Sequence, residues 1–291
     1  MKQNAAAGHL AALFTILIWG TTFISTKVLL EDFAPVEILF FRFVIGYLAL
    51  LAADRRPIKG AGRRRELTFV GAGLCGNCLY YLMENIALTY TMASNVSVIV
   101  ATAPFFTAFL FWLFMRSEEK PGVGFVLGFL AAMAGIGLIS FNGAQMKLNP
   151  LGDVLALGAA VVWGCYSVLS KKMGGFGCPL IASTRHTFFY GILFMIPALF
   201  LFGFRLDLSR FADPLNLFNM VYLGIGASAA CFVSWNYAMH SLGAVRASVY
   251  IYLVPVITVV FSALILGEPV TVLSLLGMGL TLAGLVLSQK K

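Results

Sequence analysis

The chain consists largely of apolar runs, each about 20 residues long, and most of its charged residues lie in the short breaks between them. At a rise of 1.5 Å per residue, about 20 helical residues cross the hydrocarbon core of a bilayer. Only 11% of the residues are charged, against about 25% in soluble domains, so too little polar surface exists to cover a water-soluble globule. The sequence therefore predicts an all-α integral membrane protein.

The apolar runs predict ten transmembrane helices. Several of the breaks are only about three to six residues long, so consecutive helices should be antiparallel neighbours. The predicted helices cover residues 10–30, 34–53, 67–89, 94–115, 122–141, 152–172, 179–203, 215–240, 244–266 and 270–289.

The distribution of basic residues predicts the orientation. Of the 20 Lys and Arg residues, 14 lie in segments that share a side with the two termini, four lie in the other connections, and two fall within helices. Six are concentrated between Arg55 and Arg65, as in a cytoplasmic loop held near anionic lipid. We therefore expect a multi-pass protein of the plasma (inner) membrane with both termini in the cytoplasm. The net charge of +8 is explained without nucleic-acid binding.

An internal repeat divides the chain into two halves, residues 1–146 and 147–291. Because each half has five predicted helices, an odd number, the second half should be inverted relative to the first, as in alternating-access transporters. Trp19-Gly20 and Lys27 recur as Trp163-Gly164 and Lys171 at an offset of 144, and the stretch from Asn85 to Pro104 recurs from Asn236 to Pro255 at an offset of 151.

These features give the chain a resemblance to a ten-helix EamA-type member of the drug/metabolite transporter superfamily. The resemblance is carried by the Trp19-Gly20 helix with Lys27, by the two stretches 85–104 and 236–255, and by the Gly267-Glu268-Pro269 turn. It implies a basket of helices around a central cavity, with the fifth helix of each half packed outside. Members of this superfamily move small metabolites, often amino acids and their relatives, usually outward.

Matching polar and aromatic stripes predict the cavity wall. Trp19 and Thr22 share one face of the first helix, and Trp163, Tyr166 and Ser167 share the equivalent face of the sixth. Aromatic rings with hydroxyl groups suit a wall that stacks an apolar group and hydrogen-bonds a polar one. Ordinary helix packing is the alternative, because hydroxyl side chains also bond across membrane helices.

A second stripe places Asn77, Tyr80, Tyr81 and Glu84 on one face of the third helix. An intramembrane carboxylate normally faces a cavity or a partner, because its burial in lipid is costly. Arg42, at a similar predicted depth in the second helix, is the candidate partner of Glu84. Such a pair would meet the carboxylate and the amine of a substrate. Tight pairing would oppose proton coupling through Glu84, and that coupling stays an open alternative.

Pro104 and Pro255 fall near the middles of the fourth and ninth predicted helices. Each removes a backbone hydrogen bond to the carbonyl four residues earlier, so each should kink its helix. Their equivalence in the repeat makes them candidate hinges. Tyr250, close to Pro255, is a further candidate substrate contact.

We predict a secondary transporter, and an exporter, of a small organic metabolite such as an amino acid or a related amphiphile. No Gly-rich phosphate loop is present, and we expect no catalytic residues, cofactor or metal. The expected partners are the substrate and the lipid bilayer, with the protein a monomer or weak homodimer. A membrane-embedded transferase and a lipid-flipping protein of the same fold are the alternatives.

Overall fold

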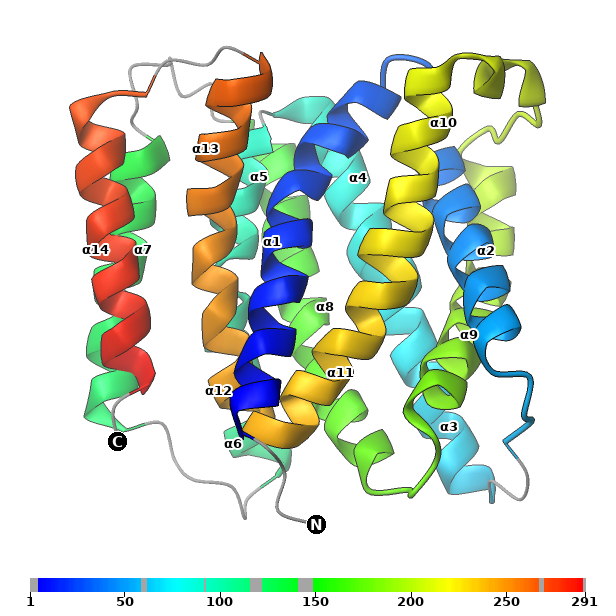
Figure 1. Ribbon diagram of the computed structural model, residues 1–291, viewed down its shortest axis with the longest axis horizontal. Coiled ribbons are helices and arrows are strands. Elements are labelled where there is room, and N and C mark those ends of the chain that lie inside the picture. Colours follow the sequence, from blue (N-terminus) through cyan, green and yellow to red (C-terminus); the bar gives the residue numbers. More distant parts are fainter. Residues whose placement is uncertain are drawn as a thin grey trace.

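The computed structural model describes residues 5–58, 62–91, 93–115, 122–140, 149–266 and 270–289, and these residues form helices joined by short connections (Figure 1). The Gly267-Glu268-Pro269 turn and the predicted break at 117–121 lie outside the described residues. The helices of the first part of the chain are α1 (Ala5–Leu29), α2 (Pro35–Ala53), α3 (Arg63–Ala72), α4 (Tyr80–Tyr90), α5 (Ala93–Val100), α6 (Ala103–Phe114) and α7 (Val123–Ser140).

The second part repeats this order with similar lengths. Its helices are α8 (Pro150–Gly174), α9 (Leu180–Leu201), α10 (Pro214–Val221), α11 (Cys231–Leu242), α12 (Ala244–Ser248), α13 (Leu253–Leu266) and α14 (Val272–Gln289), with short 3₁₀ helices η2 (Leu208–Ala212) and η4 (Val249–Tyr252).

Seven helical spans of the described residues are long and apolar enough to cross a membrane, which confirms a multi-pass membrane protein. They are 5–29, 35–53, 96–114, 150–174, 180–201, 214–242 and 244–265, and the cores of α7 and α14 form two shorter apolar helices. The ten-helix count of the sequence prediction is not established by this criterion.

One π-helical stretch interrupts the third helical run of each half, and the sequence analysis predicted neither. They are η1 (Gly73–Leu79), between α3 and α4, and η3 (Tyr222–Ala230), between α10 and α11. Close inter-helix contact explains the glycines in them. A Cβ on Gly73 would lie 2.7 Å from the Thr187 carbonyl oxygen in α9, and one on Gly224 would lie 3.1 Å from the Arg42 carbonyl oxygen in α2. The wider π turns thus pack directly against the second helix of the other half.

Helices α7 and α14 pack against each other at one side of the bundle, apart from most other helices (Figure 1). Glycines permit this contact. A Cβ on Gly135 would lie 2.5 Å from the carbonyl oxygen of Gly277, and one on Gly284 would lie 2.6 Å from that of Gly128. The arrangement agrees with the expectation that the fifth helix of each half lies outside the central basket.

The start of α1 and the end of α14 lie at the same end of the bundle, which we call the terminal face (Figure 1). On the opposite face, Arg210 joins the α1–α2 connection to the segment after α9. Its Nη1 donates to Glu37 Oε2 at 2.8 Å and to the Asp32 carbonyl at 2.7 Å, and Glu37 Oε1 accepts the amide of Arg205 at 2.9 Å. We call these contacts the Glu37 clasp.

A second clasp lies on the terminal face. Arg185, near the start of α9, donates to the backbone carbonyls of Asp54 and Arg56 in the connection after α2, with Nη2 2.7 Å from the Arg56 oxygen. We call these contacts the Arg185 clasp. Each clasp therefore joins the start of the second helix of one half to the connection that follows the second helix of the other half.

Candidate substrate cavity

A small cavity lies among helices from both parts of the chain, inside the bundle. Helix α1 and the α4 segment supply polar and aromatic groups, α8 supplies Trp163, and the helix breaks before Pro104 and Pro255 supply apolar ones. The lining residues are Trp19, Thr22, Phe23, Tyr80, Tyr81, Glu84, Val100, Ala103, Trp163, Ile251 and Val254.

Aromatic rings form the main wall of the cavity. The Trp19 and Trp163 rings meet edge to face with centroids 5.2 Å apart, and Tyr80 lies 4.8 Å from Trp163. Trp19 Nε1 donates to the Ala227 carbonyl at 3.0 Å. The buried Trp163 Nε1 has no hydrogen-bond partner among the described residues. The ring that carries this buried donor packs against Trp19 and Tyr80 in the cavity wall, and an acceptor on a ligand would satisfy the N–H.

The two helix breaks contribute equivalent residues. Val100 and Ala103 of the first break correspond to Ile251 and Val254 of the second at the offset of 151 found in the sequence repeat. The sequence analysis did not name these four residues. The signal was present, since Ala103 and Val254 directly precede the two repeated prolines.

Glu84 lies in this wall, in α4, and is 2% exposed. Among the described residues that line the cavity, it is the only one with a carboxylate. Its equivalent in the other half, Trp235, is fully buried and packs 5.1 Å from Trp19. The repeat is therefore asymmetric at this position, where the first half has a carboxylate and the second half an indole ring.

Arg42 is fully buried but does not form the expected ion pair with Glu84. Its Nε donates to Ser228 Oγ at 3.0 Å, and its guanidinium carbon lies 4.2 Å from the centroid of the Tyr81 ring. No acidic oxygen among the described residues lies within 4.0 Å of its nitrogens, and Nη1 and Nη2 have no hydrogen-bond partner there. The position of Arg42 on α2 therefore directs its side chain towards η3. The ring of Tyr81, which lines the cavity, lies against its guanidinium group.

The remaining predicted substrate contacts lie outside the lining of the cavity. Tyr166 packs 5.0 Å from Trp163, and its hydroxyl donates to Asn236 Oδ1 at 3.0 Å. Ser167 donates to the Trp163 carbonyl at 3.0 Å within α8. Tyr166 therefore packs against the wall residue Trp163, while Ser167 bonds within its own helix.

Asn77 and Tyr250 are also placed away from the lining. Asn77 lies in η1, where its side chain occupies the space beside Gly191 of α9 and its amide atoms find no hydrogen-bond partner in the described part of the chain. The Tyr250 hydroxyl lies 2.6 Å from Nδ1 of His9. A one-residue difference decides this placement, because the 3₁₀ turn of η4 directs Ile251 to the cavity instead.

Pro104 and Pro255 lie near the middles of the apolar spans 96–114 and 244–265, as predicted, and at each of them the span is broken into two helices. Pro104 lies in the first turn of α6, after a turn at residues 101–102, and Pro255 is the third residue of α13, after η4. The missing amide of proline is unpaired in a first turn anyway, which explains why each helix restarts there.

The cavity holds about 30 Å³, roughly the space of one water molecule. Sites for small organic ligands measure about 300–1,000 Å³. The helices that carry the rings must therefore separate before a metabolite fits between them.

Comparison with known proteins agrees with this architecture. The sequence profile of the EamA-like transporter family matches residues 6–141 and again residues 150–289. An uncharacterised transporter of Archaeoglobus fulgidus is 29% identical, with 97% of each chain covered. A probable terminal-alkyne amino-acid exporter of Streptantibioticus cattleyicolor is 28% identical over 97% of this chain and 93% of its own.

The fold agrees as well. A solved crystal structure with 20% sequence identity superposes over 98% of this chain and 96% of its own, with a TM-score of 0.74. The profile match covers nearly the whole chain in two consecutive parts, and the related proteins are transporters rather than enzymes by name. The chain belongs to the EamA-like transporter family.

Proposed function

We propose that this protein is a secondary transporter of the plasma membrane that exports a small amino-acid-like amphiphile by alternating access. Its ten membrane segments form two inverted five-helix halves, residues 1–146 and 147–291, and both termini are cytoplasmic. The observation that carries this proposal is the nearly closed aromatic cavity, to which both halves contribute equivalent residues.

The small volume of the cavity supports alternating access. Residues from α1, α4, α8 and the two helix breaks must move apart to admit a metabolite, and the two clasps provide separate contacts on opposite faces. Opening one face while the other stays clasped would expose the cavity to one side at a time.

The lining supports the substrate class. Tryptophan and tyrosine rings suit an apolar side chain, and the Glu84 carboxylate suits an ammonium group. The unpartnered Trp163 N–H and the Arg42 guanidinium, behind Tyr81, suit a carboxylate. The name of the relative from Streptantibioticus cattleyicolor, an amino-acid exporter, favours the same class.

Counterflow in proteoliposomes tests the proposal. Purified protein is reconstituted with unlabelled neutral amino acids inside, and uptake of radiolabelled aromatic and aliphatic amino acids is compared with that of Glu84→Gln. We expect Glu84→Gln to lose most transport of substrates that carry an amine. Glu31→Gln, which removes an exposed carboxylate from the α1–α2 connection, is the matched control and should transport normally.

Folding of each variant is checked by thermal unfolding, and the released substrate is analysed by mass spectrometry. A chemically altered product would contradict the proposal in favour of a transferase. Wild-type rate and pH dependence in Glu84→Gln would remove Glu84 from the mechanism, including from any coupling to protons.

A further inference from the structure

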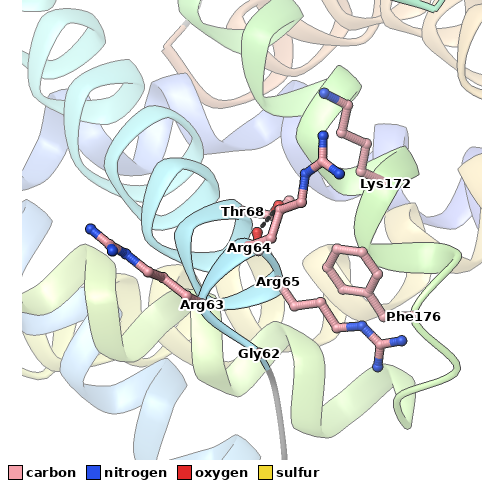
Figure 2. A pocket seen from close by; sticks show the side chains of 7 residues that line it. All are labelled: Gly62, Arg63, Arg64, Arg65, Thr68, Lys172 and Phe176. Carbon is pink, nitrogen blue, oxygen red and sulfur yellow. Dashed lines mark hydrogen bonds between the residues drawn. The ribbon is translucent and has the colours of Figure 1, made fainter.

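We propose that a basic hollow on the terminal face binds the phosphate headgroup of an anionic membrane lipid. The hollow has a volume of about 960 Å³ and lies between the start of α3 and the end of α8 (Figure 2). It is separate from the substrate cavity and shares no residue with it. Its lining residues are Gly62, Arg63, Arg64, Arg65, Thr68, Lys172 and Phe176.

Cations from two distant parts of the chain converge here. The Arg64 side chain extends towards Lys172, while Arg65 lies against the Phe176 ring with its guanidinium carbon 5.4 Å from the ring centroid (Figure 2). Arg64 and Lys172 form no ion pair within the described part of the chain. Like charges that converge without a carboxylate repel one another, and a bound anion would remove that repulsion.

The nearest acidic residue along the chain is already engaged. Glu66, one turn into α3, accepts a hydrogen bond from the Tyr190 hydroxyl, and its Oε1 lies 2.7 Å from His186 Nε2. Both partners belong to α9, and Glu66 is not among the residues that line the hollow. Within the described part of the chain, Glu66 therefore forms its contacts with α9 and no ion pair with the basic residues of the hollow.

The surroundings favour a lipid over a soluble phosphate. Leu67 lies three residues after Arg64 in α3, so the two side chains share one side of the helix, and Leu67 is 59% exposed. Phe176 adds an apolar surface within the hollow. A headgroup phosphate over Arg64 and Lys172, with acyl chains along Leu67, would satisfy both kinds of surface.

This inference goes beyond the general excess of positive charge on one side of the membrane. That excess places basic residues near the headgroups, but it does not require Arg64 and Lys172, 108 positions apart, to line one hollow. A diffuse layer of lipid would respond equally to every basic residue on this face. A defined site would respond to these two more strongly than to others.

Native mass spectrometry of the purified full chain distinguishes these cases. The protein in neutral detergent is titrated with phosphatidylglycerol and, separately, with zwitterionic phosphatidylcholine. We expect one tightly held phosphatidylglycerol, bound about fivefold more weakly by Arg64→Gln or by Lys172→Gln. Lys172→Arg keeps the charge and should retain binding. Arg55→Gln, which removes an exposed charge on the same face outside the hollow, should bind as the wild type does.

An equal loss of lipid in Arg55→Gln would overturn the proposal, because it would indicate diffuse attraction. Equal binding of the two lipids would overturn it as well. Millimolar inorganic phosphate is added in a third experiment. If phosphate displaces the lipid completely and binds with the same dependence on Arg64 and Lys172, the site takes free anions and the lipid proposal is overturned. The thermal unfolding temperature of each variant confirms that the comparison is made between folded proteins.

Discussion

At the scale of single residues, the buried donors without partners stand out. Arg42 Nη1, Arg42 Nη2 and Trp163 Nε1 are buried and have no hydrogen-bond partner among the described residues. Leaving such a donor unpaired costs about 1–3 kcal/mol, and more for a charged group. We interpret these unpaired donors as groups that form their hydrogen bonds with a bound substrate.

Arg42→Gln should weaken transport of substrates that carry a carboxylate. Loss of one charge-assisted hydrogen bond should raise the half-saturating substrate concentration about tenfold. Substrate analogues without a carboxylate should be affected much less by this change. Counterflow with an amino acid and its decarboxylated amine measures the difference, and equal effects on both substrates would contradict a carboxylate contact.

Asp54 provides a prediction about pH at the terminal face. The backbone amide of Arg56 and then its guanidinium hold the pKa of Asp54 below its ordinary value of 3.8. Because the folded pKa is lowered, the stabilisation is complete at pH values above the ordinary pKa of 3.8 and is lost as the pH falls through the folded pKa. The unfolding temperature of the wild type should therefore exceed that of Asp54→Asn at neutral pH, and this difference should vanish in acid. A difference that is independent of pH would contradict an electrostatic role.

At the scale of elements, the interruptions of the helices contribute to the cavity and to the packing between the halves. The π-helical stretches η1 and η3 and the breaks before Pro104 and Pro255 occur at equivalent places in the two halves. The breaks bring residues to the cavity, while the π stretches pack against α9 and α2. Interrupted helices give the backbone freedom to rearrange at these points.

The two clasps should control opposite faces. Glu37→Gln weakens the bidentate contact with Arg210, and Arg185→Gln removes the contacts with the connection after α2. We expect the first change to speed labelling of Thr22→Cys from the outside, and the second to speed labelling from the cytoplasmic side. A membrane-impermeant maleimide on oriented vesicles, in a cysteine-free background, measures both rates. Identical changes from both sides would contradict separate control.

Pro255→Ala should slow turnover more than it lowers substrate affinity. Alanine supplies the missing amide, so η4 and α13 can join in one continuous helix and lose the break that presents Ile251 and Val254. Pro104→Ala makes the equivalent change in the other half. Transport rate and equilibrium binding are measured separately, and unchanged turnover in both variants would reduce the prolines to structural features.

At the scale of the whole molecule, the structure places the start of α1 and the end of α14 on one face, together with the basic hollow (Figure 1). This agrees with the excess of basic residues predicted for the side of the termini. By the positive-inside rule, we propose that this face is the cytoplasmic one.

Site-directed labelling tests the orientation. In intact cells, we expect the introduced thiol of Arg55→Cys to be protected from an impermeant reagent and that of Ser209→Cys to react. Arg55 and Ser209 are both exposed, and they lie in connections on opposite faces of the bundle. Inverted vesicles should give the reverse pattern, and reaction of the Arg55 position in intact cells would contradict cytoplasmic termini.

Much of the fold and part of the cavity followed from the sequence, for a physical reason. A bilayer requires apolar helical segments of a fixed length, so runs of apolar residues predict helices at nearly the observed positions. The repeated motif then pointed to Trp19 and Trp163, and helical spacing pointed to Tyr80, Tyr81 and Glu84. These predictions depend on local patterns that any reader of the sequence can count.

Only the tertiary structure decided which partner each polar side chain has. Depth in the membrane suggested a pair between Arg42 and Glu84, but rotation of α2 about its axis directs Arg42 to Ser228. The 3₁₀ turn at η4 gives the cavity Ile251 and leaves Tyr250 with His9. Spacing along one helix fixes which residues share a face, whereas the packing of distant helices fixes what that face meets.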